Sequence, residues 1–465
     1  MSAPGDALPS GRLLSFYGDD YTGSSAVMEV LTFAGVPTVL FLGLPTDKQL
    51  ARFADFRAVG VAGVARSQSP QWMIEHLPPV FERLAALMAP ISHYKVCSTF
   101  DSTPHVGSIG KAIELAEPIL GGDWHPLIVG APAIARYQAF GNLFAAIGTE
   151  GYRLDRHPIM ARHPVTPMDE ADVRRHLASQ TRIPVGLVDF VAIKNGRADA
   201  RLASERSQGA RIVAIDVLDD ETLIEAGRLV WENRGKRLFT VGSQGLEYAL
   251  VAYWRAAGLL PEISNTTGPA RSERVVVVSG SCSAITAGQI SKALDSGFEG
   301  IRLDATQALD PGTWEAELAR GAAQALKALG EGHDPLVFTA SGPDDPAVPA
   351  LNEAIATSGE VSSDVNARIG DGLGKVLDRV VRAAALKRAI ISGGDTSGHA
   401  AMALGIHAVT AIAPLAPGSP LCRAYADEPA HDGLEIAFKG GQMGTADFFC
   451  VARQGDASET SKGRN

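Results

Sequence analysis

The segment that points most directly to chemistry is YGDDYTG, in which two carboxylates stand side by side. Asp19 and Asp20 follow an apolar run and precede a stretch with helical spacing. Neighbouring like charges repel each other, so the pair is costly unless a ligand, a metal ion or a helix N-terminus uses it. Such carboxylates can bind sugar hydroxyls, accept a proton or ligate Mg²⁺. The structural alternative is that one aspartate caps the helix and the other is solvated.

A second polar constellation lies in the segment YKVCSTFDSTPHVGSIG. Lys95 is followed by Asp101, Ser102 and Thr103, and a helix is expected from about Ser108. Hydroxyls, backbone N–H groups and one cation at a helix start suit a small carboxylate or phosphate. An ordinary capped helix beside a surface lysine would give the same pattern.

Three loops rich in glycine and serine follow apolar runs in the C-terminal part, and they read SGSCS, SGGDTSG and KGGQMG. Glycine lets the backbone approach a phosphate closely, and the N–H groups of a helix start face the anion. The candidate residues in these loops are Ser279, Ser281, Gly393, Gly394, Asp395, Thr396, Ser397, Gly440 and Gly441. Neither GxxxxGK[ST] nor GxGxxG is present, so only the three loops together predict a nucleotide-phosphate site.

Other polar residues give weaker indications. Arg136, in GAPAIARYQAFGN, is a candidate partner for a carboxylate and equally a surface residue. His399 follows the SGGDTSG loop and is more typical of a helix residue beside a site than of a catalyst. The histidines form no HExxH motif and no recognisable Ser/His/Asp order.

The composition is that of an ordinary globular chain without a basic surface. Of 465 residues, 42 are basic and 52 acidic, which gives a formal net charge of -10. This balance argues against general binding to nucleic acids or anionic membranes. The four cysteines form no CxxC pair, and no segment resembles a secretory signal or a membrane span. We therefore expect a cytoplasmic protein.

Apolar runs alternate with helical patterns along the chain, which predicts an α/β fold with mostly parallel sheets flanked by helices. The opening motif predicts a helix that is capped by Thr22 or Ser24 and ends at Gly35. The length favours two domains, and the polar segment Pro261–Glu273 separates them. The expected limits are a flexible N-terminus at 1–11, a first domain at 12–262, a linker at 263–272, a second domain at 273–452 and a disordered tail at 453–465.

Taken together and in order, the motifs resemble those of the four-carbon acid sugar kinases. GDDYTGSSAVMEVLTFAG is similar to the DDxTG element of that family, and YKVCSTFDSTPHVGSIG to its lysine plus Asp-Ser-Thr element. The segments HPVTPMDE, VGSQGLEYAL, VVSGSCSAIT, SGGDTSGHAAMALGI, PGSPLCR and KGGQMG follow in family order. The resemblance extends from about Arg12 to Phe449.

This resemblance implies an ATP-dependent kinase that acts on short sugar acids such as tetronates and 3-oxo-tetronates. It also implies an N-terminal acid-sugar domain, a C-terminal nucleotide domain and an active site in the cleft between them. ATP and Mg²⁺ are the expected cofactors, without assigned metal ligands. The expected partners are the sugar acid and ATP, with no nucleic acid and no membrane, and a homo-oligomer stays open.

Site residues can be carried over from the family one by one. The residues expected to face the acid sugar are Asp19, Asp20, Lys95, Asp101, Ser102 and Thr103, with Gly242, Ser243 and Gln244 near the cleft. The residues expected to face ATP are Ser279, Ser281, Gly394, Asp395, Thr396, Ser397 and Gly441. The catalytic candidates are Asp19, Asp20 and Asp395. One aspartate of the pair would orient hydroxyls while the other accepts the proton or caps the helix, and Asp395 would hold Mg²⁺ or water.

The chain departs from the family pattern after its Asp-Ser-Thr element. Many members continue with Leu-Arg-Gly, whereas this chain reads Pro104-His105-Val106-Gly107. The missing arginine removes a bidentate carboxylate partner. This suggests a branched or differently oxidised acid, and the segment resembles members that act on 3-oxo-isoapionate. Two alternatives stay open: a non-catalytic two-domain sensor of acid sugars and, less favoured, a lyase in which Lys95 forms a Schiff base.

Overall fold

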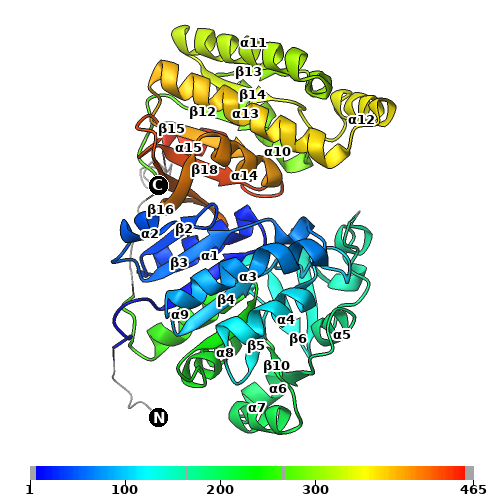
Figure 1. The fold of residues 1–465 in the computed structure, drawn as a ribbon, viewed down its shortest axis with the longest axis vertical. Helices are drawn as coiled ribbons and strands as arrows, with labels where there is room; N and C mark the ends of the chain where they lie inside the picture. Colours follow the sequence, from blue (N-terminus) through cyan, green and yellow to red (C-terminus); the bar gives the residue numbers. More distant parts are fainter. Residues whose placement is uncertain (1–6, 164, 263–267, 456–465) are drawn as a thin grey trace, which may run out of the picture. The chain divides into compact units, whose positions relative to one another are not determined.

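The computed structural model describes residues 7–163, 165–262 and 268–455. The chain divides into two compact units, Met1–Ser264 and Asn265–Asn465. Each unit is built on a mainly parallel sheet flanked by helices, which confirms the predicted fold class (Figure 1). The active-site cleft expected between the domains stays a prediction.

The main sheet of the first unit is parallel throughout, in the order β2-β3-β1-β4-β11-β5-β10-β9. Its strands are β1 (Leu14–Gly18), β2 (Thr38–Phe41), β3 (Ala58–Ala62), β4 (Ile91–Lys95), β5 (His125–Ile128), β9 (Val185–Val188), β10 (Ile212–Ile215) and β11 (Leu238–Gly242). Runs such as AVGVA and LFTVG are buried along their whole length, because helices cover both faces of a parallel sheet.

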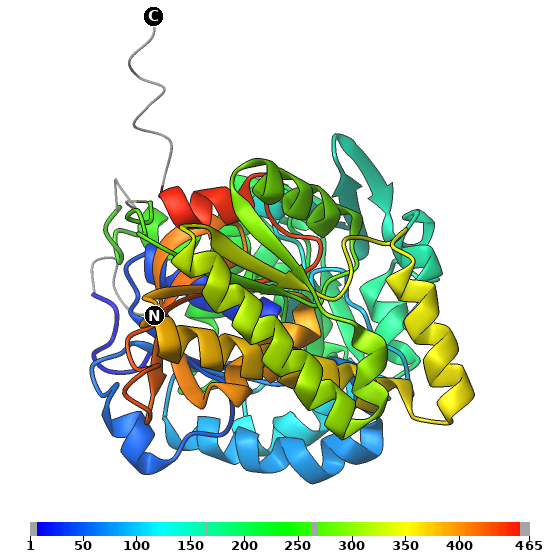
Figure 2. The ribbon, with the colours of Figure 1, turned by 90° about the horizontal axis from the view of Figure 1, so that it is seen from above.

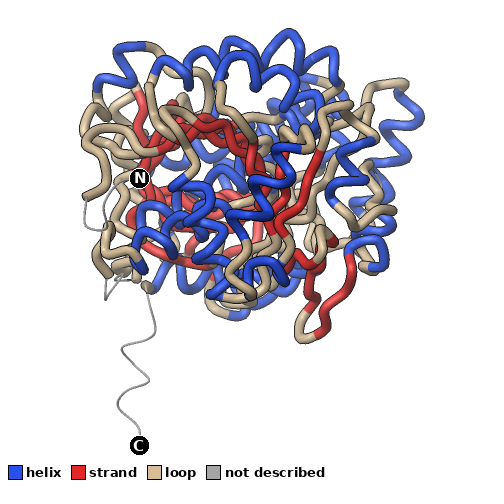
Figure 3. Tube along the Cα trace, turned by 90° about the horizontal axis from the view of Figure 1, so that it is seen from below, coloured by secondary structure: helices blue, strands red, loops and turns tan. Residues whose placement is uncertain are grey.

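Helices α3 and α4 pack together over one face, where their apolar side chains join those of the strands in one core cluster. Helices α1, α8 and α9 pack against one another on the opposite face, as right-handed crossovers require. The helices of this unit are α1 (Tyr21–Phe33), α2 (Asp47–Ala51), α3 (Pro70–Ala86), α4 (Ile109–Leu120), α5 (Val173–Ala178), α6 (Phe190–Lys194), α7 (Ala198–Ser207), α8 (Asp220–Glu232) and α9 (Gly245–Ala256). A separate antiparallel sheet of three strands, drawn red in Figure 3, comprises β6 (Arg136–Ala139), β7 (Asn142–Ile147) and β8 (Glu150–Arg153).

The strand order reverses direction at β1. After β1 the chain adds β2 and β3 on one side of it, and then places β4 on the other side. Gly18 at the end of β1 lies in register with Lys95 at the end of β4. In open α/β sheets, ligands bind outside the carboxyl ends of the strands at such a reversal. The loops that follow β1 and β4 therefore occupy the expected ligand position.

The second unit repeats this order as β13-β14-β12-β15-β18-β17-β16. The strands β12 to β15 and β18 are parallel, and β17 pairs antiparallel with both β18 and β16. The strands are β12 (Val276–Ser279), β13 (Phe298–Arg302), β14 (Asp334–Phe338), β15 (Arg388–Ser392), β16 (Ile406–Ala416), β17 (Ser419–Ala426) and β18 (Glu435–Lys439). The direction reverses at β12, whose end lies beside the end of β15.

The two long helices of the second unit, α11 and α13, lie side by side (Figures 1 and 2). Its helices are α10 (Ala284–Asp295), α11 (Pro311–Gly330), α12 (Ala347–Ser358), α13 (Ser362–Ala384), α14 (Gly394–Ala403) and α15 (Phe448–Gln454). No helix within the described ranges is long and apolar enough to cross a membrane.

Three sequence expectations need adjustment. The cap of α1 is Asp20, two residues before the predicted Thr22 and four before Ser24, because its carboxylate accepts the Gly23 N–H at 3.0 Å. Helix α15 runs to Gln454, two residues into the predicted tail, and Arg453 forms an ion pair with Asp334. Residues 263–267, where the linker was expected to begin, and most of the tail lie outside the described residues.

Gly242 is predicted to be essential for the fold. Its φ is +154°, and a Cβ added there would lie 1.9 Å from the carbonyl oxygen of Ile128. Gly242→Ala should lower the free energy of unfolding by about 3 kcal/mol or more, because backbone atoms must move. Gly258→Ala is the matched control: φ is +71° and nothing lies within 4 Å, so the cost should be about 1–2 kcal/mol. Equal losses for the two variants in urea unfolding would contradict the prediction.

Candidate active site

Asp20 is held by three kinds of contact at the start of α1. Its carboxylate accepts hydrogen bonds from the Thr22 hydroxyl at 2.7 Å and from the Gly23 N–H. It also pairs with the Arg66 guanidinium at 3.0 Å and with Lys95 Nζ at 3.8 Å. Burial acts to raise the pKa of Asp20, but the Arg66 and Lys95 charges and the two hydrogen bonds outweigh it and lower the pKa to about 2. Asp20 is therefore an ionised, immobilised carboxylate.

Arg66 is the site residue that the sequence patterns missed. It lies in a short 3₁₀ turn, Ala65–Ser67, after β3, and its N–H donates to the carbonyl of Asp19 at 3.1 Å. Gly107 permits this arrangement, since a Cβ there would lie 2.4 Å from the Arg66 carbonyl oxygen. The side chain is 32% exposed and can reach a ligand. The one feature of the sequence that could have indicated Arg66 is its position just after a buried strand, which the other site residues share.

Lys95 ends β4 and is buried against the first turn of α1. A Cβ on Gly23 would lie 2.0 Å from Lys95 Nζ, so a larger residue at that position would displace the ammonium group from where it lies. We call Asp19, Asp20, Arg66 and Lys95 the carboxylate–cation cluster. It contains three of the predicted residues and joins the loops after β1, β3 and β4.

Asp19 differs from Asp20 in its hydrogen bonding and in the direction of its pKa shift. The residue is 2% exposed, and Oδ1 is buried with no hydrogen-bond partner in the described part of the chain. Burial and then the Asp20 charge raise the pKa of Asp19 to about 7, against the opposing charges of Lys95 and Arg66. A carboxyl group whose pKa lies near neutrality can exchange a proton under ordinary conditions. The surroundings of the two aspartates thus shift their pKa values in opposite directions.

The Asp-Ser-Thr segment is ordered mainly by internal contacts. Asp101 accepts the Thr99 hydroxyl at 2.5 Å and acts electrostatically on Asp19. The Ser102 hydroxyl is buried and contacts His176 Nε2 and the side-chain amide of Gln180, both at 2.8 Å. The Thr103 hydroxyl closes a turn with the backbone of residues 105 and 106. Neither hydroxyl contacts the carboxylate–cation cluster, so both shape the loop while Asp101 borders the cluster.

The remaining predictions for this unit have different outcomes. Arg136 is half-buried, and its guanidinium interacts electrostatically with Cys97 and Asp101, while Nε is buried without a partner. The Ser243 hydroxyl is fully buried and donates to the Val129 carbonyl at 2.7 Å, which makes it part of the loop frame. Arg136 is therefore better placed than Ser243 to meet a ligand.

A buried histidine–glutamate pair lies beneath Lys95 and was not predicted. His93 Nδ1 lies 2.6 Å from Glu247 Oε1, and both side chains are fully buried. His93 Nε2 donates to the Gly242 carbonyl at 3.1 Å, and the same carbonyl accepts the N–H of Val96 at 2.7 Å. The pair therefore ties β11 and α9 to the end of β4, where Lys95 emerges.

In the second unit, the SGSCS and KGGQMG loops are joined to each other. Ser283 caps α10 and donates to the Gly441 carbonyl, which also accepts the Thr286 hydroxyl at 3.2 Å. The Ser281 hydroxyl contacts Thr286 Oγ1 at 3.0 Å. A Cβ on Gly441 would lie 2.9 Å from Ser281 Oγ, which explains the glycine there.

The SGGDTSG loop adjoins SGSCS at the end of the neighbouring strand. Added Cβ atoms on Gly280 and Gly393 would lie 2.4 and 2.7 Å from Thr396 Oγ1, so the two loops approach closely. Ser397 donates to the Gly393 carbonyl at 2.6 Å. Gly394 and Asp395 open α14, and the Asp395 side chain lies outside the described part of the structure. The structure thus gathers the predicted phosphate-site loops at one sheet edge.

The described residues provide no cluster of metal-binding side chains. Among the described side chains, no three His, Cys, Asp or Glu residues are placed to hold a metal ion. Mg²⁺ is commonly held by one or two carboxylates together with substrate phosphates and water. The glycine loops fit a metal that arrives on a phosphate chain rather than in a cage of protein ligands.

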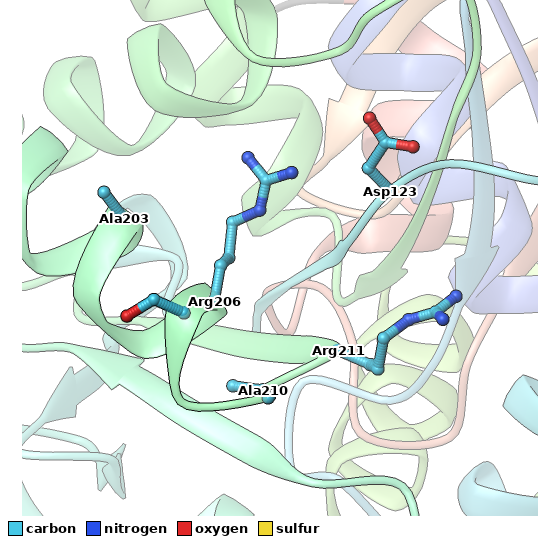
Figure 4. Close-up of a pocket in the computed structure, with 7 residues that line it drawn as sticks. Asp123, Ala203, Arg206, Ala210 and Arg211 are labelled. Carbon is cyan, nitrogen blue, oxygen red and sulfur yellow. The ribbon is translucent and has the colours of Figure 1, made fainter.

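A surface hollow of about 450 Å³ lies at the other edge of the first unit's sheet, lined by Asp123, Arg206 and Arg211 (Figure 4). Asp123 precedes β5, and Arg211 precedes β10, where it pairs with Glu117. The hollow is therefore at the amino ends of the strands. It is not part of the candidate site.

Comparison with known families and proteins agrees with this division. A model described as a sugar-binding N-terminal domain matches residues 14–250, and one described as a nucleotide-binding C-terminal domain matches residues 276–449. The chain is 49% identical to a 3-oxo-isoapionate kinase of Paraburkholderia graminis, over 97% of this chain and 96% of the relative. It is 31% identical to a 3-oxo-tetronate kinase of Cupriavidus necator, over 94% and 95%.

Two solved structures share the fold. One is a Haemophilus influenzae protein with a TM-score of 0.70, which covers 94% of this chain and 99% of that one. The other, from Salmonella typhimurium LT2, was described as a putative tRNA synthase and has a TM-score of 0.77, with 95% and 98% covered. Both are 24% identical to this chain, so they support the architecture alone.

The two aspartates should affect stability in opposite directions. The raised pKa of Asp19 keeps its carboxyl group protonated in the folded state up to about pH 7, so this group lowers stability progressively as the pH rises from about 4 to about 7 and by a constant amount above that. The lowered pKa of Asp20 gives stability that is present above pH 4 and is lost towards pH 2. At pH 8, Asp19→Asn should raise the free energy of unfolding by about 1–3 kcal/mol, and Asp20→Asn should lower it by a similar amount.

Urea unfolding at pH 8 and pH 4 measures these differences, and the effect of Asp19→Asn should shrink at pH 4. Asp123→Asn is the control, because that carboxylate is exposed and forms no ion pair with a described residue. Changes of the same sign at pH 8 for the two site variants would contradict the assignment.

Proposed function

The chain belongs to the four-carbon acid sugar kinase family, and from this premise we infer that it is an ATP-dependent kinase that phosphorylates a hydroxyl of a short-chain sugar acid. The observation that carries the chemistry is the buried Asp19, whose pKa is raised to about 7, beside the ion pairs of Asp20 with Arg66 and Lys95. A kinase needs an acceptor hydroxyl that is held in place and a group that takes its proton.

The proposed substrate class is a branched 3-oxo acid of the 3-oxo-isoapionate type. The support is the identity of 49% to a relative of that name, against 31% or less for the 3-oxo-tetronate kinases described with it. The Pro104–Gly107 segment, which lacks the arginine of many family members, is consistent with an altered acid site.

In the proposed mechanism Asp19 is the proton acceptor. The acceptor hydroxyl oxygen attacks the γ-phosphorus, its bond to phosphorus forms as the bond to the bridging oxygen of ADP breaks, and its proton passes to Asp19. The raised pKa of Asp19 and its unpartnered Oδ1 support this role. Asp20 stays ionised and holds Lys95 and Arg66 in position.

Recognition of the acid is assigned to the cations. Lys95, Arg66 and Arg136 come from three different loops, and each acts on a carboxylate of this region. A substrate carboxylate would compete for the exposed part of Arg66 and for the unsatisfied Nε of Arg136. Asp101 would accept a substrate hydroxyl.

On the nucleotide side, the loops around Ser281, Gly393, Gly394 and Gly441 would cradle the phosphates through backbone N–H groups. Mg²⁺, bound mainly through those phosphates, would spread their charge during transfer. Asp395 and Thr396, in the first turn of α14, are the residues proposed to approach the metal. The free cysteines fit a reducing, cytoplasmic setting.

The two alternatives lose support. The relatives are named as kinases, which disfavours a sensor. A Schiff-base lyase needs a lysine amine free to attack a carbonyl, whereas Lys95 is buried beside Asp20.

The base assignment predicts a pH profile. The rate of the wild-type enzyme should rise as the pH passes through about 7, because only ionised Asp19 accepts a proton. Asp19→Asn should lower kcat by about 10²–10⁴-fold and abolish this rise, with the KM for ATP nearly unchanged. Asp123→Asn is the control and should behave as wild type. A profile that rises through pH 7 in Asp19→Asn would assign the ionisation to another group.

The function itself is tested by a coupled ADP-release assay. The panel contains threonate, erythronate, their 3-oxo forms, and apionate-type acids including 3-oxo-isoapionate. The highest kcat/KM should be found for the branched 3-oxo acid. ADP release that is no faster with any of these acids than without them would refute the kinase activity, and a preference for 3-oxo-tetronates would refute only the substrate class.

A further inference from the structure

Lys439 is a buried basic residue for which the described part of the chain supplies no counter-charge. It ends β18, and its side chain is fully buried. Nζ donates to Thr286 Oγ1 at 3.0 Å and to the Gly440 carbonyl at 2.9 Å. None of the described carboxylates pairs with it, and burial lowers its pKa to about 8. Burying an amine in this way is unfavourable unless a negative group arrives to use it.

The position of Lys439 in the sheet adds a second observation. Ser279, Ser392 and Lys439 end the adjacent strands β12, β15 and β18 in one register row. The hydroxyls of Ser279 and Ser392 are buried, and neither has a hydrogen-bond partner among the described residues. Buried polar groups are normally satisfied, so two unpaired hydroxyls in a row with an unpaired cation suggest a missing ligand.

Lys439 also supports the loops that surround this row. Its carbonyl accepts the Gly393 N–H at 2.8 Å, and its ammonium group reaches Thr286, which donates to the Gly441 carbonyl. One residue thereby connects all three glycine-rich loops. A change at Lys439 acts on each of them.

We propose that Lys439 is a positioning residue for the phosphate chain of a nucleotide, holding the three glycine-rich loops together and attracting the phosphates from beneath them. Because little water separates a buried charge from the loop above it, its attraction for an anion is weakly screened. The inference rests on the proposed nucleotide-binding role of this unit and adds the cation that its motifs lack. Lys439 thus takes the electrostatic role of a P-loop lysine without that motif.

Binding of adenosine, ADP and the ATP analogue AMP-PNP to the full-length chain tests this proposal by calorimetry. Lys439→Met should weaken ADP and AMP-PNP binding by about 10–100-fold, the range for loss of a charged hydrogen-bonding partner, and leave adenosine binding unchanged. Lys439→Arg should retain most of the preference for phosphorylated ligands. Lys292→Met, which removes an exposed lysine of α10, is the matched control and should bind all three as wild type does.

Thermal unfolding without ligand separates this role from a purely structural one. A structural lysine would lower the Tm and weaken adenosine and ADP binding equally, and that result would overturn the proposal. If Lys439→Met does not fold, the Lys439→Arg variant tests the proposal instead. Lys439→Arg keeps the positive charge, so a folded Lys439→Arg variant that no longer prefers ADP over adenosine would also overturn the proposal. A wild-type chain that binds no nucleotide at all would instead refute the proposed function.

Discussion

The ion pairs of Asp20 with Arg66 and Lys95 are the interaction on which the rest of the candidate site depends. They tie together three loops that follow three adjacent parallel strands, β3, β1 and β4. They also fix the ionised Asp20 beside Asp19, and burial together with this negative charge outweighs the opposing effect of Lys95 and Arg66 and raises the pKa of Asp19. Two neighbouring residues of one type thereby acquire opposite properties, which is how proteins separate an orienting carboxylate from a proton acceptor.

Both units have the same strand topology around their first strand. In each, the first strand lies centrally, the next two strands add on one side and the fourth adds on the other. This reversal leaves a crevice at the carboxyl edge of the sheet, and each unit ends a nearby strand there with a buried lysine, Lys95 in one and Lys439 in the other. The surroundings differ: Lys95 pairs with a carboxylate, whereas Lys439 donates to one hydroxyl and one carbonyl. The first arrangement suits a ligand that brings hydroxyls and one acid group, and the second suits a polyanion.

Particular residues show which parts of the candidate site could be predicted from sequence patterns. Asp19, Asp20, Lys95 and the three glycine loops were identified because each follows an apolar run, and strand ends are short-range features. Ser102 and Ser243 were predicted as site residues because they belong to the motifs, yet their hydroxyls form hydrogen bonds that hold their own loops in shape. Arg66 was missed because its partner, Asp20, lies far away in sequence. The His93–Glu247 pair was missed for the same reason.

The sequence alone determined the alternation of strands and helices, the α/β class and the loops at which ligands would be sought, because these follow from local periodicity and from glycine. Tertiary structure alone decided that the pKa of Asp19 is raised and that of Asp20 lowered, which buried lysine has a carboxylate partner among the described residues, and which buried hydroxyls lack a partner there. Those properties arise from burial and from Coulomb interactions between strand ends that the sheet order brings together, and neither can be read from spacing along the chain.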